Sequence, residues 1–280
     1  MQRAACFLRI AAGQVHGVWN GASWGGGQRF EAASGFGAEE DEPTLRDAVD
    51  AVLTAILPPR RLTSPFLCVT LEGPLVMAAI LPFAKLPKAQ EDRRLIISQR
   101  FCREHRLEPG KIEVLGSQLQ GPKTANDRML CLAVERNILR EFQSALFERD
   151  LHADIIAPDC LMKFTRINGS ELEKPGLSLF EENGFATILV WDGDGSLAHI
   201  ATVRRPAPHD LEGQRRMAAR VRRYAYIVAR DDTPVAVYFE RRPAGNLFKD
   251  LASHRAIKLA AWPSERQSSP KGSPSKGSAK

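Results

Sequence analysis

Hydrophobic residues recur with two different periods along the chain, one typical of strands and one of helices. Apolar runs at 4–10, 15–20 and 28–33 predict three strands, the first two joined in a hairpin through Ala12-Gly13. Over 43–57 the apolar residues recur every three or four positions, which predicts a helix that the pair Pro58-Pro59 ends. The chain thus begins with strands and continues into a helix.

The rest of the chain repeats this alternation. Strands at 66–70 and 75–81 are predicted to pair as a second hairpin, and strands at 185–191 and 196–203 as a third, which turns at Asp192-Gly193-Asp194-Gly195. Residues 168–183 are interpreted as a polar connection. Further helices are predicted at 89–105, 135–150, 158–167 and 210–230, and further strands at 111–120, 129–134, 152–157, 235–240 and 256–262. A strand hairpin near Ala4 and another near Phe185 indicate an α/β protein of two lobes.

Composition excludes several classes of protein. The 280 residues are 44% hydrophobic and 26% charged, the proportions of a globular chain. No apolar run approaches the roughly 18–20 residues of a membrane helix, and the N-terminus lacks the pattern of a signal peptide, so we expect a cytoplasmic protein. Residues 264–280 are rich in Ser, Pro, Lys and Gly, which predicts a disordered basic tail.

The net charge of +6 is divided between this tail and the body. Four basic residues and Glu265 give the tail a charge of +3, so the body keeps about half of the excess. With few aromatic residues to stack on bases, this charge does not favour nucleic acid as a partner. The predicted helix at 210–230 is either simply solvated or docks on an acidic partner or an anionic membrane surface through five arginines: Arg215, Arg216, Arg220, Arg222 and Arg223.

The polar side chains form no recognisable catalytic or metal-binding motif. The five cysteines have no C-x-x-C spacing, and their odd number suits a reducing compartment. Cys6, Cys68 and Cys131 lie in apolar, strand-like runs and are predicted to be small buried hydrophobes. The turn at 192–195 is either a metal-binding loop or a tight hairpin turn, and we favour the turn. No histidine pair or nucleophile motif indicates a hydrolase. These residues alone predict an α/β protein without a visible active site, metal or cofactor.

Three stretches of the chain nevertheless resemble a known family. They are residues 66–120 with Lys85-Leu86-Pro87, residues 129–158, and Phe185–Asp192 with its returning strand. Their order is similar to that of the actin-like PilM proteins of type IV pilus assembly and the related GspL cytoplasmic domain of type II secretion. The resemblance implies an actin-like (ribonuclease-H-like) two-lobed fold, with mixed sheets and flanking helices. It places a first lobe at 1–183 with an inserted subdomain at about 66–120, a reduced second lobe at 184–263, and the tail at 264–280.

The chain departs from this family at the nucleotide site. Arg9 stands where ATP-binding relatives carry an Asp, and Ala11 stands where they carry a Gly. Val190 falls at the corresponding Asp position of the second lobe. The resemblance therefore implies no ATP hydrolysis and no cofactor. Any nucleotide that did bind would use Gly13, Asp192, Gly193, Asp194 and Gly195.

The function that the resemblance implies is a non-catalytic cytoplasmic scaffold, peripheral at the inner membrane. It would bind the cytoplasmic segment of a single-span inner-membrane partner in a pilus or type II secretion-like assembly platform. The alternative is a divergent actin-like ATPase or small-molecule kinase. The identity of the machine, the docking surface and the oligomeric state stay open at this point.

Overall fold

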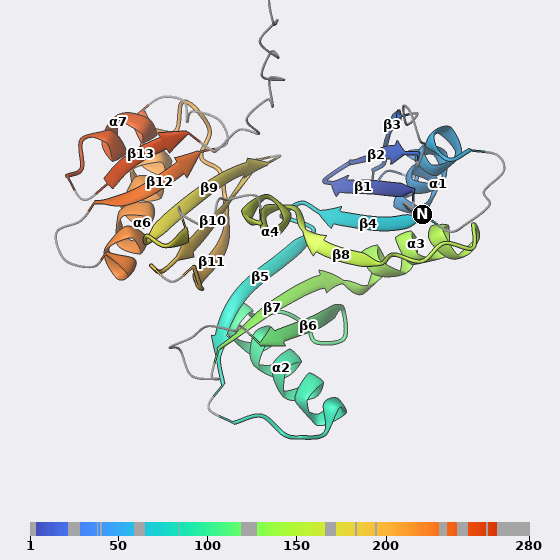
Figure 1. The fold of residues 1–280 in the computed structure, drawn as a ribbon, viewed down its shortest axis with the longest axis horizontal. Coiled ribbons are helices and arrows are strands. Elements are labelled where there is room, and N and C mark those ends of the chain that lie inside the picture. Colours follow the sequence, from blue (N-terminus) through green and yellow to red (C-terminus); the bar gives the residue numbers. More distant parts are fainter. Residues whose placement is uncertain are drawn as a thin grey trace, which may run out of the picture.

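The protein consists of two lobes and a smaller subdomain (Figure 1), and their described residues form three β-sheets. The computed structural model describes residues 4–21, 29–37, 39, 41–58, 65–83, 85–118, 128–165, 172–182, 184–193, 195–229, 234–239, 246–255 and 257–261. The Gly-rich segment 22–27, Asp194 and the predicted tail at 264–280 lie outside these residues.

The first lobe is a five-stranded sheet of order β3-β2-β1-β4-β8. The predicted first hairpin is confirmed, since β1 pairs antiparallel with β2, while β4 runs parallel to both β1 and β8. The strands are β1 (Ala5–Ala11), β2 (Gln14–Asn20), β3 (Arg29–Gly35), β4 (Phe66–Leu71) and β8 (Ile155–Pro158). Helices α1 (Leu45–Ile56) and α3 (Arg136–Phe147) contact each other and pack their buried residues into the core of this lobe.

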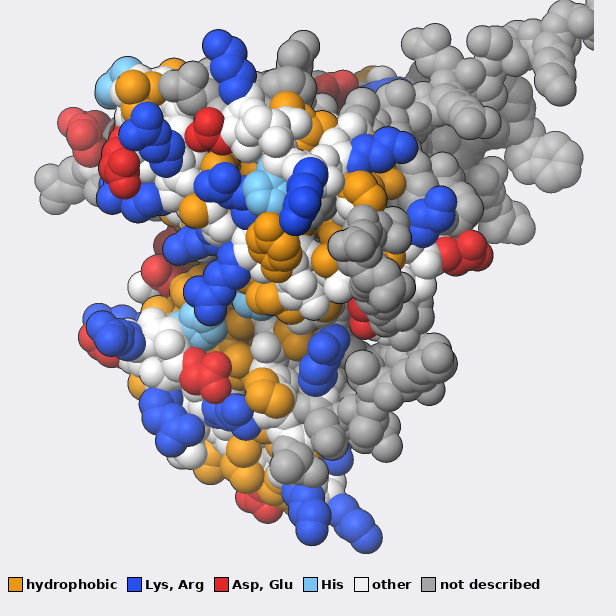
Figure 2. Space-filling model, turned by 90° about the vertical axis from the view of Figure 1, so that its left-hand side faces the viewer, with side chains coloured by type: hydrophobic (Ala, Val, Ile, Leu, Met, Phe, Trp, Pro, Cys, Tyr) orange, Lys and Arg blue, Asp and Glu red, His pale blue; other side chains and the backbone are white. Residues whose placement is uncertain are grey.

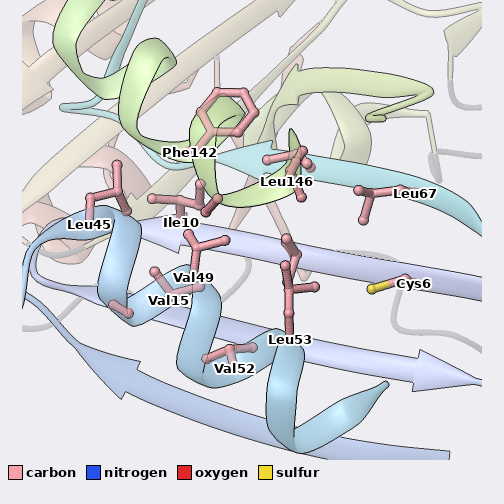
Figure 3. Close-up of a cluster of buried hydrophobic side chains, with 14 of the residues drawn as sticks. Cys6, Ile10, Val15, Leu45, Val49, Val52, Leu53, Leu67, Phe142 and Leu146 are labelled. Carbon is pink, nitrogen blue, oxygen red and sulfur yellow. The ribbon is translucent and has the colours of Figure 1, made fainter. Parts of the chain in front are cut away.

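Side chains from α1, α3 and the sheet interdigitate in this core (Figure 3). Gly17 of β2 permits the close packing of α1, because a Cβ atom at this position would lie only 2.4 Å from Val52 Cγ1. The amphipathic spacing that predicts α1 places Val49, Val52 and Leu53 in the same cluster. The helical period in the sequence thus determines which face of α1 is buried.

The subdomain is a three-stranded sheet of order β5-β7-β6 with one helix, α2 (Gln90–His105). Its strands are β5 (Val76–Pro82), β6 (Ile112–Gln118) and β7 (Arg128–Glu135). The predicted second hairpin is therefore wrong: β4 joins the first sheet, and β5 pairs with β7. The inserted unit runs from β5 to β7 instead of over 66–120, because two adjacent apolar runs do not specify their own strand partners.

The second lobe repeats the topology of the first in the order β11-β10-β9-β12-β13. The third predicted hairpin is confirmed as β10 paired with β11. Its strands are β9 (Gly176–Glu182), β10 (Phe185–Trp191), β11 (Leu197–Arg204), β12 (Val235–Phe239) and β13 (Ile257–Ala261), and its helices are α6 (Leu211–Val228) and α7 (Asn246–Ala252). This lobe is the smaller one because no counterpart of the inserted subdomain occurs in its described part.

Strand β9 corrects the boundary predicted between the lobes. It lies in the stretch interpreted as a polar connection, and it pairs with β10 through an antiparallel register. A boundary between 183 and 184 would cut this hairpin in two. The strand ends in Glu181 and Glu182, so its sequence looks polar. Its apolar residues Leu177, Leu179 and Phe180 are nevertheless buried.

The lobes contact each other through a shared hydrophobic cluster. Phe180 and Leu189 of the second sheet pack with Ala78 of β5 and with Cys160 of α4 (Asp159–Phe164). Polar contacts accompany it, since the Arg128 guanidinium donates a 2.8 Å hydrogen bond to the Leu197 carbonyl oxygen. The prediction for Cys6, Cys68 and Cys131 is confirmed, because all three are buried. Cys102 and Cys160 are buried as well, and all five cysteines are free.

Candidate functional site

A charged cluster with two buried carboxylates lies where three parallel strands of the first sheet end. Arg9 comes from β1, Glu72 follows β4, and Asp159 begins α4 directly after β8. The Arg9 guanidinium forms an ion pair with the Glu72 carboxylate, and its Nη2 lies 3.9 Å from Asp159 Oδ2. Lys163 Nζ is 2.8 Å from that Asp159 oxygen and 5.6 Å from the centre of the Phe180 ring in the second lobe.

The cluster balances its own charge. Glu72 is only 2% exposed, and burial raises its pKa while Arg9 acts in the opposite direction. Buried carboxylates stay ionised at low cost only when cations pair with them, and here two cations face two carboxylates. Arg9, the residue that departs from the family pattern, therefore neutralises acidic side chains of its own lobe.

The residues predicted to hold any bound nucleotide do not lie in corresponding turns. Gly13 closes the β1–β2 turn with φ of 77°, and Gly184 closes the matching β9–β10 turn with φ of 81°. Asp192, Gly193 and Gly195 lie instead in the β10–β11 turn, at the other end of the seven-residue strand β10. The placing of Val190 at the Asp position of the second lobe is therefore wrong, because the strand that corresponds to β1 is β9 and not β10.

Asp192 has a structural role in its own turn. Its Oδ1 accepts a 3.1 Å hydrogen bond from the Ser196 amide, and its carbonyl accepts one of 3.1 Å from the Gly195 amide. Gly195 adopts φ of 78°, a left-handed conformation that favours glycine. These bonds are those of a tight hairpin turn, as the sequence interpretation favoured. The described residues contain no cluster of His, Cys, Asp or Glu able to hold a metal ion.

The five arginines of α6 divide into two groups. Arg216 and Arg220 line a hollow of about 850 Å³ together with Arg204, and the other three do not line it: Arg215, Arg222 and Arg223. Helix α6 lies on the side of the molecule that Figure 2 turns toward the viewer, where more basic than acidic side chains are visible. The sequence predicts the basic helix but not the hollow, which also needs the end of β11.

A groove between the first lobe and the subdomain is a second candidate site. One hollow of about 510 Å³ is lined by β5, β6, β7, α3 and β8, and a hollow of about 590 Å³ continues it along α3. The two share Arg140, Gln143 and Ile156, so we treat them as one groove and name it the β8 groove. Its apolar lining includes Leu71, Val76, Leu115, Leu132, Val134, Leu139, Phe142, Leu146, Phe147, Leu151 and Ala153.

The β8 groove combines an apolar floor with basic side chains. Arg136 lies 3.5 Å from Glu113, whereas Arg94 and Arg140 form no ion pair within the part of the chain that the structure describes. Strand β8 is the last strand of its sheet, so one of its edges has no strand partner among the described residues. An extended segment could bind such an edge through backbone hydrogen bonds and place side chains in the hollows.

The sequence reasoning missed the groove and the charged cluster. Both combine residues from distant parts of the chain, and the pairing of β5 with β7 creates one wall of the groove. One signal was available: Glu72 and Asp159 each directly follow a strand, and the carboxyl ends of parallel strands meet at one edge of a sheet.

No helix of the described part of the chain is long and apolar enough to span a membrane. Comparison of the sequence with protein-family models gives no match, and comparison with curated proteins gives none either.

Solved structures, in contrast, match nearly the whole chain. A chain of a PilM–PilN type IV pilus biogenesis complex matches with a TM-score of 0.60 at 10% identity, covering 91% of this chain and 88% of that one. The cytoplasmic domain of EpsL, an inner-membrane component of the type II secretion system of Vibrio cholerae, matches with a TM-score of 0.51 at 10% identity, covering 94% and 90%.

A Bacteroides thetaiotaomicron protein of unknown function with an actin-like ATPase fold matches with a TM-score of 0.57 at 7% identity, covering 92% of this chain and 91% of that one. The repeated five-stranded sheets and these structural likenesses agree with the resemblance that the sequence predicts. The chain therefore has the actin-like fold.

Proposed function

We propose that this protein is a non-catalytic scaffold of a type IV pilus or type II secretion-like assembly platform. It would bind the cytoplasmic segment of a single-span inner-membrane protein and thereby lie in the cytoplasm at the inner membrane. The observation that carries the proposal is the β8 groove, an apolar channel beside a strand edge that pairs with no other described strand. The likeness to a PilM–PilN complex and to the EpsL cytoplasmic domain supports it.

The groove suits an extended segment better than a folded partner. Its two hollows follow one another along α3 and β8, so an occupant must be long and narrow. Backbone groups on the β8 edge supply hydrogen bonds to any sequence, while the apolar hollows select large aliphatic or aromatic side chains. Arg94 and Arg140 add a preference for a segment that carries negative charge.

The charged cluster supports the non-catalytic part of the proposal. An ATPase site needs positive groups that face the phosphates and carboxylates that hold their metal ion. Here Arg9 and Lys163 are engaged by Glu72 and Asp159. A nucleotide would have to break these contacts before it could use the same side chains.

Two leucines of the subdomain allow a matched test. Leu115 lines the groove and is 52% exposed, whereas Leu95 is 56% exposed and does not line it. Immobilised wild-type protein and the variants Leu115→Glu and Leu95→Glu are exposed to detergent-solubilised membranes, and the retained proteins are identified by mass spectrometry. We expect wild type and Leu95→Glu to retain a single-span inner-membrane protein, and Leu115→Glu to lose it.

A synthetic peptide of the retained protein's cytoplasmic segment should then compete for the wild type. Retention that Leu115→Glu leaves unchanged would place the interaction outside the groove. Failure to retain any inner-membrane protein would contradict the scaffold proposal.

A further inference from the structure

The outer face of α6 combines positive charge with exposed apolar side chains. Its exposed arginines are Arg215, Arg216, Arg220 and Arg223, and Glu212 is the only acidic residue of the helix. Leu211 in the first turn and Tyr226 and Ile227 in the last are also exposed. Soluble helices usually bury such side chains, whereas the headgroup region of a membrane accommodates cations and apolar groups together.

At the N-terminal end of this face lies the hollow of about 850 Å³. Arg216 and Arg220 are one helical turn apart and therefore project from the same side of α6. Arg204, at the end of β11, reaches the hollow from the sheet. None of these three guanidinium groups forms an ion pair or hydrogen bond with any residue that the structure describes, so their donors remain available to a ligand.

Hydrogen bonds from Gln214 fix the loop that forms one wall of the hollow. The buried amide of Gln214 donates hydrogen bonds to the carbonyl oxygens of Ala207, at 3.3 Å, and Pro208, at 2.6 Å. Its oxygen accepts a 3.3 Å bond from the Leu247 amide, which ties the loop to α7. A loop fixed in this way loses little entropy when a ligand binds beside it.

The ligand chemistry follows from these groups. Guanidinium groups match phosphate oxygens with paired hydrogen bonds, and three of them favour an anion that carries more than one phosphate charge. Asp210 also lines the hollow, but its carboxylate accepts a 2.8 Å bond from the Gly213 amide and caps α6.

We propose that the outer face of α6 docks on an anionic lipid surface and that the hollow binds the phosphate groups of a lipid headgroup. The exposed apolar residues at both ends of the helix favour a lipid over a soluble phosphate, which would have no use for them. The proposal rests on the proposed function only for its place at a membrane. Its test contains no partner protein, so its failure is distinct from failure of the groove.

Two triple variants that lose the same charge separate a headgroup site from general electrostatic attraction. The hollow variant Arg204→Gln/Arg216→Gln/Arg220→Gln and the control variant Arg215→Gln/Arg222→Gln/Arg223→Gln each lose three cations. Full-length proteins are sedimented with vesicles of neutral phosphatidylcholine, or of phosphatidylcholine containing one third phosphatidylglycerol or cardiolipin. Each arginine near an anionic surface contributes about fivefold in affinity. Loss of three cations should by itself weaken the control variant by up to about a hundredfold. We expect the hollow variant to lose at least tenfold more, because its guanidinium groups also form paired hydrogen bonds with phosphate.

Three results would overturn the proposal. Wild type that does not sediment with anionic vesicles excludes lipid docking. Equal losses in the two variants reduce the interaction to general electrostatics, with no headgroup site. Inorganic pyrophosphate that binds the wild type but not the hollow variant, without any vesicle binding, makes the ligand a soluble phosphate. Circular dichroism verifies that both variants fold, as we expect because Arg222 is half-buried and the other five arginines are exposed.

Discussion

In the first lobe, the chain leaves β3 and the Phe36 amide donates a 3.0 Å hydrogen bond to the carbonyl of Gly13 in the β1–β2 turn. In the second lobe, the Arg205 amide makes the same bond, at 2.8 Å, to the carbonyl of Gly184 in the β9–β10 turn. Each lobe then enters a helix, α1 or α6, through a residue whose side chain caps it. The two backbones follow one plan at these places.

The side chains in the two connections that lead into α1 and α6 carry opposite charges. The connection before α1 contains Glu39, Asp41 and Glu42, while the connection before α6 begins with Arg204 and Arg205. Apolar period and turn glycines specify the backbone, and the exposed positions beside them vary independently. The comparison teaches that the binding properties of each lobe reside in exposed side chains that the fold does not constrain.

The largest loss of stability is expected when a glycine that packs against buried side chains is replaced, and each lobe contains one such glycine. In Gly176→Ala the new Cβ would lie 2.2 Å from the Trp191 ring, and in Gly17→Ala it would lie 2.4 Å from Val52 Cγ1. We expect each to lose about 1–3 kcal/mol of unfolding free energy, with Gly176→Ala the larger because an indole yields less than an aliphatic side chain. Urea unfolding measures both.

Gly110→Ala is the control for these two variants, since no atom lies within 4 Å of its Cβ position. It should change stability by less than about 0.5 kcal/mol. A Gly176→Ala protein as stable as wild type would contradict the packing described for the second lobe.

Helix caps give the next largest effect. Thr44 accepts a 3.2 Å bond from the Asp47 amide at the start of α1, and Asp210 accepts one of 2.8 Å from the Gly213 amide at the start of α6. Thr44→Ala and Asp210→Ala should each cost about 1 kcal/mol in urea unfolding. Asp210→Asn retains a capping oxygen and should cost only a few tenths. Destabilisation by Thr44→Ala alone would show that the lobes are not capped alike.

The second lobe also contains a side chain that should make stability depend on pH. This is His199, whose ring nitrogen lies 2.8 Å from the Tyr224 hydroxyl. Burial lowers the pKa of His199 in the folded protein. Below about pH 6.5 the unfolded chain binds a proton at this residue before the folded chain does, so stability falls as the pH falls. His199→Gln should therefore lose less stability than wild type between about pH 7.5 and pH 5.5, by up to about 1 kcal/mol. Equal losses would contradict the burial of this ring.

The smallest effect is expected from Mg-ATP. Saturating nucleotide should leave the thermal unfolding midpoint unchanged, because Arg9 and Lys163 are paired within the charged cluster. A ligand at about 100 times its Kd would stabilise the folded state by about 2.7 kcal/mol, which a thermal scan detects readily. A clear increase would favour the alternative of a divergent ATPase or kinase.

The sequence predicts those parts of the fold that depend on local pattern. Helices α1, α3 and α6 follow from apolar residues at helical spacing, and the β1–β2 hairpin from two apolar runs around Gly13. Local pattern does not predict which strands pair, since β4 and β5 are adjacent in the chain but belong to different sheets. The actin-like order of elements, carried by the family resemblance, supplies the topology that periodicity alone does not.

The sites are less accessible to sequence reasoning than the fold. Asp192 and its neighbours attract attention because acidic and glycine residues occur together, yet their hydrogen bonds are those of a turn. Arg9 pairs with Glu72 across more than sixty positions of sequence, and no local pattern joins them. Only the basic helix was visible in advance, and even there the division between Arg216 and its neighbour Arg215 needs three dimensions.

The five buried cysteines have a practical consequence. Burial raises the pKa of the Cys68 thiol, and raises that of Cys131 to about 12, so neither becomes a thiolate at neutral pH while the protein stays folded. The thiols are distributed over the architecture: Cys6 in the first sheet, Cys131 in the subdomain, and Cys160 in the cluster between the lobes. The rates at which thiol reagents modify them would therefore report how often each part of the native molecule opens, without any engineered label.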